Sequence, residues 1–178
     1  MDRVNHICLR ATYSEWINTK LIDAICELAE DTTDSMDQEL TALLHLMNES
    51  VMADILWLKR FAENIPLLSD MFSEIDLKLM TDDKQSNLHP LKLSHIRQSL
   101  DQMITRWSSS VSVHDLDSFL QYICTGGISQ KKNFFTAIMH FFNHQAFVRE
   151  KMISQLSMKN INFHVTDLLV PHACQLEI

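Results

Sequence analysis

Apolar positions along the chain recur mostly at steps of three and four residues, which is the spacing of one face of a helix. The clearest run lies between 131 and 156, where one broad apolar stripe is interrupted by neither proline nor glycine. Its members are Phe134, Phe135, Ile138, Phe141, Phe142, Ala146, Met152 and Ile153. The pattern predicts a long central helix from Lys131 to Leu156.

The same spacing predicts three earlier helices. They run from about Val4 to Ala29, from about Gln38 to Glu63 and from about Ser94 to Ser109. The apolar positions of the second helix cover more than one stripe. That breadth indicates either a central helix or one that contacts another subunit.

Two connections and a tail separate or follow these helices. The segment Asn64–Pro90 is longer than the usual link between antiparallel neighbours, and it is long enough to cross a bundle. The extended-looking segment Phe119–Cys124 precedes the chain's two glycines, Gly126 and Gly127, and predicts a strand-like stretch and a turn. The residues after Leu156 are too few for another long helix and are expected to pack across the others.

Composition limits the fold class, the partners and the cellular location that we expect. A chain of 178 residues fits a single domain, 1–178, and only five positions hold glycine or proline, which favours an all-α fold. The net charge of −8 argues against a nucleic-acid partner. Four widely spaced cysteines indicate reduced thiols in the core. Because no signal peptide and no apolar run of about 20 residues is found, we expect a cytoplasmic protein with no membrane partner.

Two histidines on the central helix are the first candidate chemistry. His140 and His144 lie four residues apart at the border of the apolar stripe, so their rings share one side of the helix. The pair is compatible with two imidazole ligands for one divalent cation. For two histidines at this spacing alone, side chains that flank a core and form ordinary hydrogen bonds are the commoner case.

Three segments, YSEWINTKL, MNESVMADILWLKRF and MHFFNHQAFVRE, together resemble the DinB-like metal-binding helical bundles. The central segment MHFFNHQAFVRE is similar to the family's signature, and MNESVMADILWLKRF is similar to its second-helix motif through Asp54, Trp57 and Arg60. The segment YSEWINTKL is similar to the first-helix pattern through Tyr13, Trp16 and Asn18, and Thr166-Asp167-Leu168 stands near the end as in the family. The resemblance therefore spans nearly the whole chain.

The resemblance implies a fold and a partner. DinB-like proteins are four-helix bundles with up-down-down-up topology and a long crossover between helices 2 and 3, which agrees with the length of the segment Asn64–Pro90. The resemblance also implies a homodimer built on helices. Nothing in it makes this acidic chain a nucleic-acid binder.

The resemblance further implies a metal site, and this chain departs from it. The family places one histidine on the second helix and two on the last. At these positions the chain has Glu49, His144 and Val148, so one ligand is kept, one becomes a carboxylate and one is lost. The best remaining set of three ligands is Glu49, His140 and His144. We expect this set to bind zinc or nickel at low occupancy, or to bind no metal. Glu49 and His144 could instead pair with each other.

Neighbouring residues complete the predicted site. His45 and His140 each lie one turn before a ligand position, but on antiparallel helices these steps diverge, which argues against a site containing both. Asn18, Tyr13, Val148 and Arg149 are predicted to line a pocket. Arg149 falls within the apolar arc and so needs a buried partner.

Two functions remain open at this point, and no catalytic residue is assigned. The first is a non-catalytic, stress-associated bundle that binds a small molecule or a protein partner, with a degenerate metal site. The alternative is a metal-dependent thiol S-transferase or hydrolase that uses Glu49, His140 and His144. In that enzyme the metal would lower the pKa of a thiol or water.

Overall fold

The computed structural model describes residues 2–31, 38–63, 65, 68–70, 89–124, 126–159 and 161. Within these residues the chain is mostly helical, as the sequence predicts, with one small antiparallel sheet. The elements in order are α1 (Arg3–Asp31), α2 (Gln38–Ala62), α4 (Pro90–Ser108), α5 (Val113–Asp117), β1 (Phe119–Ile123), β2 (Ser129–Asn133) and α6 (Phe134–Met158).

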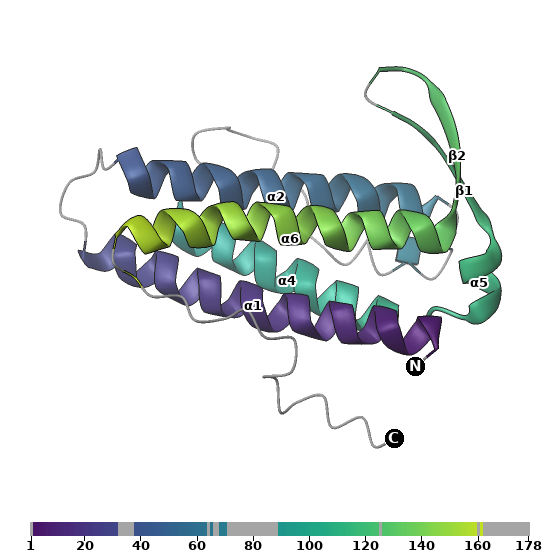
Figure 1. Ribbon diagram of the computed structural model, residues 1–178, viewed down its shortest axis with the longest axis horizontal. Coiled ribbons are helices and arrows are strands. Elements are labelled where there is room, and N and C mark those ends of the chain that lie inside the picture. Colours follow the sequence, from purple (N-terminus) through teal and green to yellow (C-terminus); the bar gives the residue numbers. More distant parts are fainter. Residues whose placement is uncertain are drawn as a thin grey trace.

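The long helices α1, α2, α4 and α6 lie side by side along the length of the molecule (Figure 1). Helix α1 packs against α4 and α6, and α2 packs against the same two helices. The Sγ of Cys8 donates to the backbone oxygen of Ser108, while further along α1 Asn18 bonds to Asp101. Since the partner number falls as the α1 number rises, α1 and α4 run in opposite directions.

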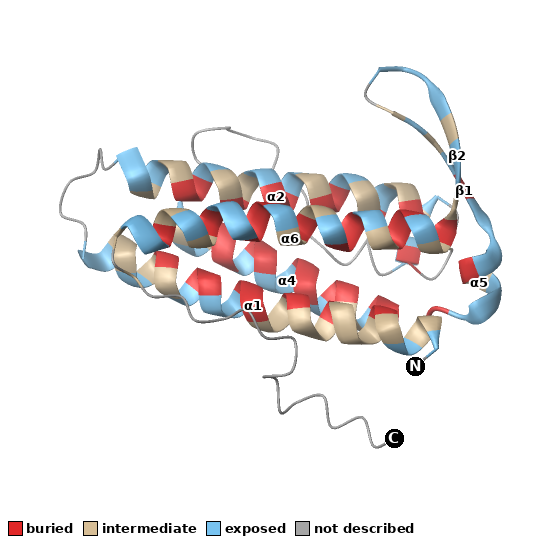
Figure 2. Cartoon of the chain, in the orientation of Figure 1, coloured by how far each residue is buried: buried red, intermediate tan, exposed pale blue. Residues whose placement is uncertain are grey.

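The helices bury their inward faces, as Figure 2 shows. One apolar cluster surrounds Phe61, whose ring contacts Trp107 and Phe134. A second cluster, built around residues such as Leu21, Leu43 and Met152, fills the other end of the helices. The core is therefore divided into two apolar parts along the helix axes.

The helix ends differ in part from the predicted ones. Helix α4 begins at Pro90, four residues before the predicted start, because proline lacks the N–H group that the first helical turn leaves unpaired. Helix α6 begins at Phe134 and not at Lys131, since residues 131–133 belong to β2. The side chain of Asn133 caps α6 by accepting a hydrogen bond from the backbone N–H of Thr136.

The predicted strand-like stretch is confirmed as β1, but its partner strand was not predicted. Strands β1 and β2 pair antiparallel, with Phe119 opposite Asn133, and the turn contains Gly127 at a φ of 77°. The hairpin projects beyond the end of the long helices (Figure 1). The short helix α5 was also missed, although Ser112 and Asp115 form a capping box at its start.

Three predictions concern residues that lie wholly or partly outside the described part of the chain. The tail after 161 and most of the connection between α2 and α4 lie outside them. Cys8, Cys26 and Cys124 are free thiols, as predicted, but they are half-buried and do not lie in the core; Cys174 lies outside the described part of the chain. Among the described helices, none is both long enough and apolar enough to cross a membrane.

Candidate functional site

The predicted metal ligands are spread over two helices. Glu49 on α2 and His140 on α6 are exposed, while His144 is half-buried. The His140 ring contacts Trp57 edge-on, at 5.2 Å between ring centroids. Among the described residues, no group of three or more His, Cys, Asp or Glu side chains is placed to hold a metal ion. The structure therefore does not gather the predicted ligand set, and metal binding stays a prediction.

The middle of the helices instead contains a buried layer of polar side chains. It lies between the two apolar clusters and takes members from all four long helices. We call it the polar layer; its members are Ser14, Asn18, Asp54, Arg97, Asp101, Gln145 and Arg149. Two arginines and two aspartates give it equal numbers of positive and negative groups.

Arg97 on α4 is the centre of the polar layer. Its Nε and Nη2 atoms donate to both carboxylate oxygens of Asp101, at 3.1 and 2.7 Å, and its Nη1 atom pairs with Asp54 on α2. Burial alone would lower the pKa of Arg97, but the two carboxylates outweigh burial and raise it. Arg97 is therefore a fixed cation that joins α4 to α2.

Two side-chain amides extend the polar layer to the other helices. The Nδ2 of Asn18 on α1 donates to both oxygens of Asp101, at 3.0 and 3.1 Å. The Nε2 of Gln145 on α6 donates to Asp54 at 2.7 Å. The Oδ1 atom of Asp54 and the side-chain oxygen of Gln145 accept no hydrogen bond from the described residues. Each aspartate thus receives an arginine and an amide from different helices.

Arg149 has the buried partner that the sequence required. It is 4% exposed, and its Nη1 atom donates to the hydroxyl of Ser14 at 3.3 Å. Burial lowers its pKa to about 10, although the charges of Asp101 and Asp54 act in the opposite direction. Arg149 therefore remains a cation at neutral pH and holds α6 against α1.

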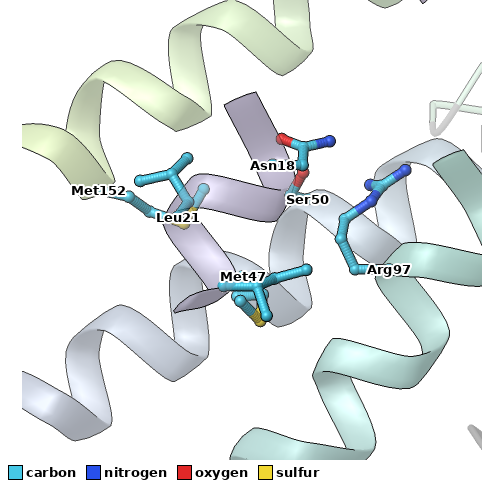
Figure 3. Close-up of a pocket in the computed structure, with 7 residues that line it drawn as sticks. Asn18, Leu21, Met47, Ser50, Arg97 and Met152 are labelled. Carbon is cyan, nitrogen blue, oxygen red and sulfur yellow. The ribbon is translucent and has the colours of Figure 1, made fainter. Parts of the chain in front are cut away.

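A small pocket lies beside the polar layer, as Figure 3 shows. Its polar lining consists of Asn18, Ser50 and Arg97, and its apolar lining consists of Leu21, Ile22, Met47 and Met152. The free volume is about 10 Å³, which is close to the space that one water molecule requires. Of the four residues predicted to line a pocket, Asn18 lines this one.

The other predicted pocket residues lie elsewhere in the packing. Tyr13 is half-buried, with its ring 6.1 Å from that of Trp16 on the same helix. Val148 is buried in the apolar cluster that includes Met152, and Arg149 bonds to Ser14. Their direct role toward a ligand stays a prediction.

Sequence reasoning missed the centre of the polar layer. Arg97 and Asp101 stand among the inward positions of the third predicted helix, next to Ile96 and Leu100. A charged residue in such a register is a signal of a buried pair, because an unpaired buried charge is costly. The sequence does not show which carboxylate on another helix completes the pair.

Asp101 gives the polar layer a measurable pH dependence. Burial raises its pKa from 3.8 to about 6, although Arg97 and Asn18 oppose the rise. Because the folded pKa is above the unfolded one, the stability from the bound proton is fully present below about pH 4 and is lost as the pH rises through about 6. The free energy of unfolding lost in Asp101→Asn should therefore be larger at about pH 4 than at neutral pH.

Urea unfolding at a series of pH values measures this difference. Asp117→Asn is the matched control, because Asp117 is exposed and forms an ion pair with the half-buried Arg3 at the surface. Its replacement removes one carboxylate from the surface and leaves the polar layer unchanged. A loss in Asp101→Asn that grows as the pH rises would show that ionised Asp101 is the stabilising form, contrary to this expectation.

Comparison with known proteins gives no assignment. No protein-family model matches the chain, and neither the curated proteins nor the solved structures provide a match. The resemblance to DinB-like bundles therefore stays a prediction.

Proposed function

We propose that this chain is a DinB-like helical bundle that works as a non-catalytic protein and acts by associating with another protein chain. Its four long helices would form the up-down-down-up arrangement implied by the resemblance, and its first partner would be a second copy in a homodimer. Antiparallel contacts between α1 and α4, and between α2 and α6, support this topology.

The observation that carries the proposal is the polar layer. Its two carboxylates both bind Arg97, each also accepts from a side-chain amide, and Arg149 donates to the hydroxyl of Ser14. A catalytic centre usually keeps a reactive group or an open ligand position available for substrate. The polar layer instead has the features of a structural network that fixes four helices relative to one another.

Within the described part of the chain, the pocket beside the polar layer is too small for a small-molecule ligand, which supports a protein partner. Sites for small molecules usually have volumes of about 300–1,000 Å³. The pocket beside Arg97 offers about 10 Å³. A ligand larger than water would have to displace Met47 and Met152, whereas contact with another chain requires no change in the interior.

The alternative function, a metal-dependent transferase or hydrolase, requires a bound metal ion. A metal-loading experiment therefore distinguishes it from the non-catalytic proposal. Under our proposal, zinc or nickel should raise the melting temperature of the wild type no more than that of His144→Ala. The physical reason is that a ligand bound only by the folded state stabilises it by mass action. The measurement is thermal unfolding with and without each metal, together with elemental analysis of protein purified without added metal.

Glu49→Ala serves as the second variant, because Glu49 is exposed and its replacement should leave the fold intact. The enzyme alternative would be supported by stoichiometric metal that survives dialysis and depends on both Glu49 and His144. Turnover of a thiol adduct that is lost in Glu49→Ala would overturn the non-catalytic proposal directly.

A further inference from the structure

Helix α2 presents a single narrow stripe of exposed side chains along most of its length. In chain order the stripe contains His45, Glu49, Met52, Leu56 and Lys59. Glu63 continues it just after the last turn of α2. The steps between these residues alternate between four and three. This alternation is the seven-residue repeat along which two helices pack in a coiled coil.

The centre of the stripe is apolar although it faces solvent. Met52 is 47% exposed and Leu56 is 45% exposed. The remaining faces of α2 are already used, because they pack against α6 and α4. The exposed stripe is therefore the part of α2 that is open to a further helix.

The side chains of the stripe are arranged symmetrically about residue 54. Positions equally distant from that point hold Met52 and Leu56, which are both apolar, and Glu49 and Lys59, which have opposite charges. The next pair outward is His45 and Glu63. In two antiparallel helices related by a two-fold axis, positions equally distant from the centre face each other across the contact.

We propose that the stripe docks against the same stripe of a second copy, with the two α2 helices antiparallel. Met52 of each copy then packs on Leu56 of the other, and Glu49 of each copy pairs with Lys59 of the other. From His45 to Glu63 the contact is about 27 Å long, from the helical rise per residue. Each favourable pair occurs twice because the contact is isologous.

Helix α6 widens the apolar centre of this contact. Gln145 bonds to Asp54, and α6 runs antiparallel to α2, so Phe147 stands at the level of Met52. Phe147 is 60% exposed, and the ammonium group of Lys151 lies 4.5 Å from its ring centroid. A second copy centred on residue 54 would therefore cover apolar side chains from both helices.

Charge complementarity selects a second copy as the occupant. Two copies with a net charge of −8 repel each other, so a stable contact needs local attraction. The antiparallel stripe provides it through Glu49 and Lys59. A parallel arrangement would lose these pairs. This inference rests on the proposed homodimer and adds its interface and its orientation.

The apolar centre is tested with Met52→Glu combined with Leu56→Glu in the full chain. This variant should raise the dimer dissociation constant by about a hundredfold or more, because like charges would be brought together across the contact. Light scattering coupled to size exclusion, over a range of concentrations, measures the change. Leu91→Glu is the matched control, since Leu91 is 60% exposed but lies on α4.

Charge reversal tests the orientation without touching the apolar centre. Glu49→Lys alone and Lys59→Glu alone should each weaken the dimer by about tenfold, because each creates a like-charge pair twice. The double variant Glu49→Lys with Lys59→Glu should restore wild-type association. Circular dichroism confirms that each variant keeps its helices, so a loss of dimer is not a loss of fold.

The outcomes separate the interface from the dimer itself. Dimers that survive the Met52 and Leu56 replacement, or single charge reversals that the double variant does not rescue, would overturn the proposed interface and leave the homodimer standing. A monomeric mass for the wild type at all concentrations would overturn both. In that case the occupant of the stripe would have to be a different protein.

Discussion

Replacing Arg97 with alanine is expected to lower the free energy of unfolding by about 3–5 kcal/mol, the usual cost of removing one partner from a buried ion pair. Arg97 is 2% exposed and is the cation that both Asp54 and Asp101 contact directly. Without it, two carboxylates would remain buried close together, with Arg149 as the remaining buried cation. Urea unfolding monitored by circular dichroism measures the loss.

Arg106→Ala is the matched control, because Arg106 is exposed on the same helix. Surface replacements usually change stability by no more than about 0.5 kcal/mol. A loss below about 1 kcal/mol in Arg97→Ala would show that water or other groups compensate the two carboxylates. The polar layer would then not be the network that fixes the helices, and the main support for the proposed function would fail.

Replacing Phe61 with alanine is expected to lower the free energy of unfolding by about 3–5 kcal/mol, as is typical for a buried aromatic residue. The Phe61 ring is fully buried, and its centroid lies 5.3–5.8 Å from those of Trp57, Trp107, Phe134 and Phe141. Its removal would leave a cavity where α2, α4 and α6 meet. Thermal unfolding and urea unfolding both measure the effect.

Phe119→Ala removes the same volume at an exposed position and is the matched control. Phe119 is on β1 with its ring beneath the ammonium group of Lys131. Its replacement should cost much less than that of Phe61, because little apolar surface is removed from the interior. Similar losses at both positions would mean that the cluster around Phe61 can collapse into the space or is less tightly packed than described.

The helices could be predicted because their signal is local. The spacing of apolar side chains reports which residues share a face, and it located α1, α2 and α6 to within three residues at every end. The same register marked Arg149 as buried, and its contact with Ser14 confirms this. His140 and His144 were proposed as ligands from their spacing, and Glu49 was added from a resemblance in which two of three ligand positions are changed, so the joint placement of the three was weakly determined.

The hairpin shows why other features could not be read from the sequence. The segment SQKKN of β2 has no alternation of apolar and polar residues, and its strand conformation depends on pairing with β1. Lys131 and Lys132 are compatible with a helix when considered locally. Pairing with β1 across the turn makes these residues a strand, because it gives hydrogen-bond partners to backbone groups that would bond only to water in an isolated extended segment.

The sequence by itself determined where the four long helices lie, which side of each is apolar and that the chain is acidic. Only the tertiary structure decided that Arg97 meets Asp54 and Asp101, and that the stripe through Met52 and Leu56 remains exposed. The physical reason is that periodicity acts within one helix, over distances of a few residues. Ion pairing and exposure depend on which helices become neighbours, and that choice is made by the packing of the whole chain.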